Sequence, residues 1–207
     1  GAAQVDMLIC NLVDVDAGSM LCAHLVREDG PMIVSALSSI ARAIGISRIW
    51  IAGTSRLAGR MSVHVRKAGA RATKIKVAAL SSAYPQSDPT MLIYALSGRR
   101  LQPARLPPAV GAIVLDAAAA IAIGRSLETG QAMLTVPIEI RDSRRAKSFV
   151  ISAAVGTPLR DVLAALGLRG PFTLRGGAAL RDIRLSPDAI VGSGELTIDA
   201  GPVAPPI

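Results

Sequence analysis

Over the first two thirds of the chain, short apolar runs alternate with segments whose apolar residues recur every three or four positions. Continuous apolar runs predict buried strands, and the longer spacing predicts helices. The predicted strands are 6–13, 48–53, 74–80 and 112–116, and the predicted helices are 19–28, 31–45, 56–70, 90–96 and 117–130. Such alternation indicates an α/β fold, and we expect a Rossmann-like parallel sheet with helices on its faces.

The pattern changes after Gly130, where strands follow one another with a single short helix between them. The predicted strands are 133–142, 147–155, 172–177 and 195–201, and the predicted helix is 158–167. Pro137 favours an edge position for its strand, and Thr157 is the expected helix cap, with Pro158 in the first turn. This order predicts a smaller β-grasp-like α+β domain, so we divide the chain into residues 1–130 and 131–207.

Composition narrows the class of protein. Hydrophobic residues make up 51% of the 207 residues and charged residues 18%, which excludes a disordered chain. No apolar run is long enough to span a bilayer, and the first residues do not form a secretion signal. We therefore expect a cytoplasmic protein without direct membrane insertion.

The sequence lacks the motifs of several kinds of metal, nucleotide and catalytic sites. The two cysteines, Cys10 and Cys22, have no CxxC partner, and no nucleotide-loop, zinc-protease or serine-hydrolase motif occurs. His24 and His64 lie inside predicted helices, where packing or surface roles are expected. We predict no catalytic residues and no metal site. The net charge of +8 permits attraction to nucleic acid, but the arginines lie far apart in sequence without interleaved aromatics, so we predict no nucleic-acid partner.

Polar residues follow the first predicted strand in the stretch CNLVDVDAGS, residues 10–19. Open α/β sheets place ligands at the carboxyl ends of their strands. Asn11, Asp14 and Asp16 could there contact ribose hydroxyls or the edge of a flavin ring. In the other interpretation, the two aspartates only end the strand and cap the next helix.

The stretch YPQSDPT, residues 84–90, is a second candidate, because Tyr84 could stack on a ring and Ser87 or Asp88 could begin a helix. The stretch that follows, residues 98–111, is too rich in proline for regular structure and too apolar for a free linker. We expect it to lie extended against the domain surface. The paired glycines in LRGGAALRD, residues 174–182, favour a tight turn.

These stretches resemble known families. CNLVDVDAGS and the helix after it resemble the flavin- and NADH-binding subunit of respiratory complex I, and YPQSDPTMLIYALSGRRLQPARLPPAVGAIVLD resembles the C subunit of the Rnf electron-transport complex. VGTPLRDVLAALG and LRGGAAL resemble the SLBB domain of that family, a β-grasp module. The resemblance implies a flavin/NADH-binding domain over 1–130 and an SLBB-like domain over 131–207.

The resemblance also implies a site and partners. Asn11, Asp14, Asp16 and Tyr84 occupy the family's cofactor-binding positions, for which FMN and NADH are the candidate cofactors. The implied partners are other protein subunits of an electron-transfer complex, which would hold the chain at the periphery of the inner membrane.

The chain departs from the family at several of these positions. Val13 and Val15 replace polar residues, Ser87-Asp88-Pro89 replaces Gly-Gly-Glu, and Leu115-Asp116 replaces an asparagine pair. The family's glycine-rich flavin loop and its cysteine-rich iron–sulfur domain have no counterpart in the residues given. These departures indicate a degenerate, non-catalytic accessory or scaffold subunit of a flavin/NADH-linked electron-transfer complex.

Two alternatives remain open. One is an FMN-dependent NADH oxidoreductase subunit whose flavin loop and iron–sulfur domain lie outside this chain. The other is an SLBB-type protein that binds a small ligand such as cobalamin.

Overall fold

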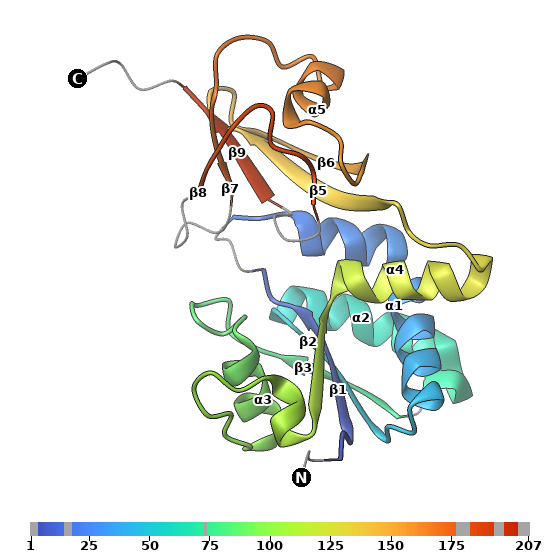
Figure 1. Cartoon of the computed structure of the whole chain (residues 1–207). Helices are drawn as coiled ribbons and strands as arrows, with labels where there is room; N and C mark the ends of the chain where they lie inside the picture. The colour runs from blue at the N-terminus through green and yellow to red at the C-terminus, as the bar shows by residue number, and fades with distance from the viewer. Residues whose placement is uncertain (1–3, 15–17, 73, 177–182, 193–196, 203–207) are drawn as a thin grey trace. The chain divides into compact units, whose positions relative to one another are not determined.

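Figure 1 shows the computed structural model, which describes residues 4–14, 18–72, 74–176, 183–192 and 197–202. These residues form two compact units. The first holds residues 4–14 and 22–132 of the described chain, and the second holds residues 18–21 and those from 133 onward. The assignment of a flavin/NADH-binding domain and an SLBB-like domain stays a prediction from the resemblance.

The first unit is built on a sheet of four parallel strands in the order β3-β2-β1-β4. The strands are β1 (Met7–Leu12), β2 (Arg48–Gly53), β3 (Ile75–Ala79) and β4 (Ala112–Asp116). β1 lies between β2 and β4, and nearly all of its side chains are buried, which explains its continuous apolar sequence. The predicted Rossmann-like parallel sheet is confirmed.

Helices cover both faces of this sheet (Figure 1). The helices are α1 (Leu21–Ala43), α2 (Ser55–Ala68), α3 (Pro89–Ser97) and α4 (Ala117–Thr129), with short 3-10 turns η1 (Gly69–Ala72) and η2 (Pro107–Val110). α3 packs on one face against Met7, Ile9 and Ala112. The other three helices cover the opposite face. None of the helices described is both long and apolar enough to cross a bilayer.

α1 replaces the two helices predicted over 19–28 and 31–45. The helical span is continuous in sequence but broken at Asp29, whose φ of −121° and ψ of 17° are not helical. Pro31 follows closely, and it has no N–H to donate to the preceding turn. The two predicted helices are thus present as two helical segments joined across a kink, and the position of the interruption was predicted correctly.

The proline-rich stretch after α3 is tied to the N-terminal segment by Arg99. Its two terminal nitrogens donate to Oδ1 and Oδ2 of Asp6 at 2.6 and 2.8 Å, and Nη1 also donates to the Val110 carbonyl at 2.9 Å. The Arg99 guanidinium lowers the pKa of the Asp6 carboxyl group, mainly through this hydrogen bonding. Because both side chains are partly exposed, we take the contribution to stability as modest.

The second unit is a five-stranded mixed sheet with one helix, α5 (Leu159–Ala165). The strands, in the sheet order β6-β5-β9-β7-β8, are Lys147–Ala154, Thr135–Asp142, Thr197–Gly201, Thr173–Gly176 and Ile183–Leu185. β5 and β6 form an antiparallel hairpin, and β9 returns parallel to β5 in the middle of the sheet. This is the β-grasp arrangement that the sequence predicts.

Two details of this unit differ from the prediction. β5, which contains Pro137, is not an edge strand, because it lies between β6 and β9, and its described pairing with β9 starts at Glu139. The residue that caps α5 is Pro158 rather than Thr157. The Thr157 carbonyl instead accepts a hydrogen bond from the Val191 backbone N–H, which fixes Thr157 outside the helix.

Gly124 allows α4 to approach α1 closely. A Cβ atom at this position would lie 2.8 Å from the Ala36 Cβ and 2.7 Å from the Met32 sulfur, both on α1. Gly59 on α2 is a matched helical glycine, since a Cβ there would meet nothing within 4 Å.

We therefore expect opposite effects from the same substitution at these two glycines. Gly59→Ala should raise the free energy of unfolding by about 0.5–1 kcal/mol, because alanine favours the helix. Gly124→Ala should lower it by about 1–3 kcal/mol, because the added methyl group overpacks the contact with α1. Chemical denaturation of the two variants measures both changes. Equal stabilisation by both would contradict the close contact.

Candidate functional site

The candidate site lies at the carboxyl edge of the parallel sheet, between β1 and β4. The chain runs from β1 outward to β2 and β3 on one side, and then crosses to β4 on the other side. This reversal is the position at which open α/β sheets bind ligands. Asn11 of β1 and Asp116 of β4 are paired in register there.

Asn11 joins β1 to the segment that precedes α3. Its side-chain oxygen accepts a hydrogen bond from the Val13 backbone N–H at 2.8 Å, and its Nδ2 donates to the Ser87 carbonyl at 3.3 Å. Ser87 is 76 positions further along the chain. The structure thus brings together the two polar stretches that the sequence analysis selected, 10–19 and 84–90.

Carboxylates cap two of the helices that begin at this edge, α1 and α4, whereas α2 begins after β2 without a side-chain cap. Asp14 accepts a hydrogen bond at 3.3 Å from the backbone N–H of Cys22, in the first turn of α1. Asp116 is the N-cap of α4, and its Oδ1 accepts from the Ala119 N–H at 2.6 Å. For Asp14, this is the capping role that the sequence analysis kept as the other interpretation.

Capping by carboxylates decides which part of a cofactor the edge can contact. The N-terminus of a helix ordinarily attracts phosphate, because its N–H groups are free and its dipole is positive. Here each of two N-termini already faces a carboxylate, and neither 7–14 nor 112–120 contains a lysine or arginine. These residues do not fit the phosphate of FMN or of NADH. Carboxylate oxygens and the Asn11 amide fit hydroxyl groups better.

Two thiols lie beside these carboxylates. Burial raises the pKa of the Cys10 thiol to about 12, and the negative charge of Asp116 adds to the effect. Burial and then the neighbouring carboxylate of Asp14 raise the pKa of Cys22 well above its ordinary value. Both thiols are therefore protonated at neutral pH, which makes them poor nucleophiles and poor metal ligands. Within the described ranges, no group of three or more potential metal ligands occurs.

Gln86 is a candidate that the sequence analysis did not select. It lies next to Ser87, and its Nε2 is buried with no hydrogen-bond partner among the described residues. A buried donor without a partner is unusual and could be satisfied by an acceptor on a ligand. Gln86 lies between Tyr84 and Ser87, which the sequence analysis selected, and this position is the only hint of it in the local sequence.

The other predicted positions are less constrained. Tyr84 is 73% exposed, so its ring is accessible but not held in a pocket. Asp16 lies outside the described residues. Cofactor binding by Asn11, Asp14, Asp16 and Tyr84 stays a prediction.

Comparisons with known proteins agree with the earlier resemblance. The family described as the Nuo51 FMN-binding domain matches residues 1–125. The C subunit of the proton-translocating ferredoxin:NAD(+) oxidoreductase complex of Clostridium ljungdahlii is 23% identical over 160 residues, which are 77% of this chain and 35% of that protein. The cobalamin reductase PduS of Salmonella typhimurium is 27% identical over 117 residues, or 55% of this chain and 26% of that protein.

Solved structures share the fold. The NAD+-reducing [NiFe]-hydrogenase in its air-oxidized state matches with a TM-score of 0.72 and 16% identity, over 95% of this chain and 40% of the matched chain. The H2-reduced state of such an enzyme matches with a TM-score of 0.70 and the same identity, over 94% and 40%. The chain thus spans well under half the length of these relatives.

The Asn11 bridge can be tested with Asn11→Asp, which keeps the acceptor for the Val13 N–H but places an oxygen against the Ser87 carbonyl. We expect the free energy of unfolding to fall by about 1–3 kcal/mol and amide exchange over residues 84–90 to become faster. Below about pH 4 the protonated carboxyl group can donate again, so part of the loss should be recovered. Unchanged exchange would show that the bridge does not hold this segment.

The thiols can be tested by alkylation of the native protein. At about pH 9 a thiol with the pKa of Cys10 is ionised to only about one part in a thousand, so Cys10 should stay unmodified by iodoacetamide. The pKa of the Cys10 thiol is higher in the folded protein than in the unfolded protein. The thiol therefore contributes to the free energy of unfolding below about pH 9, and this contribution is lost between about pH 9 and 12. Asp116→Asn should leave most of the protection, since burial is its main cause. Mass spectrometry measures the labelling, with guanidinium-unfolded protein as the control.

Proposed function

The chain belongs to the family of the Nuo51 FMN-binding domain, and we propose that it is an accessory subunit of a flavin- and NADH-linked electron-transfer complex. In this role its α/β unit and its β-grasp unit serve as a scaffold for other protein subunits. The carboxyl edge of its parallel sheet holds neither flavin nor NADH.

One observation carries this proposal, namely the capping of α1 by Asp14 and of α4 by Asp116. A bound dinucleotide or FMN must place a phosphate near positive charge or free N–H groups. Between β1 and β4 the starts of α1 and α4 present a carboxylate instead, and these carboxylates would repel a phosphate there. The protonated state of Cys10 and Cys22 also argues against thiol chemistry at the same place.

The names of related proteins support the proposal that the partners of this scaffold are other protein subunits. Curated relatives are named as subunits of multi-subunit oxidoreductase complexes, among them an ion-translocating oxidoreductase complex of Edwardsiella ictaluri, whose C subunit is 23% identical over 181 residues. That match covers 86% of this chain and 22% of the relative. We propose by extension that such partners connect this chain to the membrane.

A second candidate function is that of an FMN-dependent NADH oxidoreductase subunit whose flavin loop and iron–sulfur domain lie outside this chain. The unpartnered Nε2 of Gln86 favours it, because that atom could donate to a carbonyl of a ring. A cobalamin-linked reductase is a third candidate, favoured by the similarity to cobalamin reductase.

Flavin binding separates the first two candidates. We expect the purified chain to show no flavin absorbance and to leave the fluorescence of added FMN unchanged. Asp116→Ser keeps a hydroxyl cap but removes the negative charge. This variant should bind FMN measurably more tightly than the wild-type chain does, if the carboxylate is what excludes the phosphate. Asp161→Ser, in the second unit, is the charge-matched control and should have no effect.

Stoichiometric flavin on the wild-type chain, bleached by NADH, would replace the accessory role with the oxidoreductase role. Flavin on this chain only after it is isolated within its intact assembly would lead to the same conclusion. A thermal shift produced by cobalamin and by neither FMN nor NADH would favour the third candidate.

A further inference from the structure

The excess positive charge of this chain is confined to one stretch of sequence. Between residues 30 and 87 there are nine lysines and arginines and no aspartate or glutamate. The rest of the chain holds the other 14 basic residues and all 15 acidic residues, so it is close to neutral. This stretch forms most of α1, all of β2 and α2, and the edge strand β3.

A groove of about 1210 Å³ lies within this cationic part of the first unit. It runs between α1 and the end of α2, next to the residues where β2 and β3 begin. Arg42, Lys67, Lys74 and His64 line it, and no acidic residue does. The groove therefore lies at the amino end of the strands, whereas the acidic edge with Asp14 and Asp116 lies at their carboxyl end.

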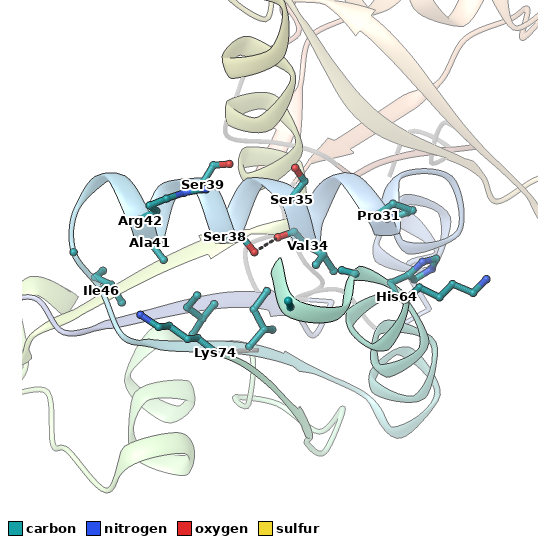
Figure 2. A pocket seen from close by; sticks show the side chains of 16 residues that line it. Pro31, Val34, Ser35, Ser38, Ser39, Ala41, Arg42, Ile46, His64 and Lys74 are labelled. Carbon is teal, nitrogen blue, oxygen red and sulfur yellow. Dashed lines mark hydrogen bonds between the residues drawn. The ribbon is translucent and has the colours of Figure 1, made fainter. Parts of the chain in front are cut away.

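Figure 2 shows the two sides of the groove, with Val34 and Ser38 on α1 facing Lys74 and Ile46. The Ser38 hydroxyl donates to the Val34 carbonyl at 2.9 Å. The apolar side chains of the floor, including Ile46 and Ile75, are almost fully buried. The groove therefore combines an apolar floor with sides that carry polar and positively charged side chains.

The cations that line the groove are available to a ligand. Arg42, Lys67 and Lys74 are exposed and form no ion pair with an acidic residue in the described part of the chain. Arg42 and Lys67 lie in the last turns of their helices, where positive charge also stabilises the helix.

We propose that this groove, with the cations Arg42, Lys67 and Lys74 that line it, docks an acidic, protruding segment of a protein partner. Charge complementarity supports an acidic ligand, because the whole stretch lacks a negative side chain. The concave shape favours a protruding element over a planar membrane surface. Nucleic acid is disfavoured because none of the residues that line the groove is Phe, Tyr or Trp. The proposal extends the scaffold role. Its test measures the binding of a peptide, so its outcome is independent of the flavin-binding test of that role.

The test uses a fluorescent amphipathic peptide of glutamate and leucine at helical spacing, titrated into the full chain. Arg42→Glu with Lys74→Glu reverses two charges in the groove. Lys147→Glu with Arg169→Glu reverses two exposed charges in the second unit, so both double variants have the same net charge. We expect the groove variant to bind the peptide at least about tenfold more weakly and the control variant less than about threefold more weakly.

Several outcomes would overturn the proposal. Equal losses in the two double variants would mean that only net charge matters. Tight binding of phosphatidylglycerol-rich vesicles or duplex DNA, lost in the groove variant while the acidic peptide does not bind, would assign the groove to another class of partner. If the groove variant is less folded by circular dichroism, Arg42→Gln with Lys74→Gln replaces it and should still weaken binding more than the neutral control, Lys147→Gln with Arg169→Gln.

Discussion

The free N–H groups of the helices that begin at the carboxyl edge of the parallel sheet must find acceptors. Asp14 and Asp116 supply acceptors for two of these helices, α1 and α4, one after β1 and one at the end of β4, whereas α2 begins at the same edge without a side-chain cap. These two hydrogen bonds fix the starts of α1 and α4, and they place negative charge where a nucleotide-binding sheet ordinarily offers positive potential. They also lie beside Cys10 and Cys22, whose thiols stay protonated.

The first unit is consequently polarised from one end of its sheet to the other. Carboxylates and an amide stand at the carboxyl edge, and the groove lined by Arg42, Lys67 and Lys74 stands where β2 and β3 begin. A surface with one sign of charge steers association with an oppositely charged partner and suppresses others. The scaffold role that we propose requires the fold and a docking surface, but it does not require a phosphate site at the carboxyl edge.

Much of the secondary structure could be predicted because it follows from local sequence. β2 and β4 have the predicted bounds, and Gly130 ends α4 in the left-handed conformation that glycine favours. Pro137 and Thr157 were predicted wrongly because their roles depend on distant partners. The pairing of β9 with β5 makes the strand of Pro137 an internal one, and Thr157 lies before the start of α5, where its carbonyl accepts from the Val191 N–H.

The sequence by itself determined which segments form strands and helices, because the spacing of apolar residues is local. It also showed the family resemblance and the polar stretches around Asn11 and Ser87. Only the tertiary structure decided what these stretches do, because a carboxylate that caps a helix and one that faces a ligand have the same sequence pattern. The hydrogen bond between Asn11 and Ser87 spans 76 positions, and no local rule predicts which distant carbonyl an amide will reach. The surplus of basic residues between 30 and 87 is visible in the sequence, but only the tertiary structure places Arg42 of α1, Lys67 of α2 and Lys74, just before β3, around one groove.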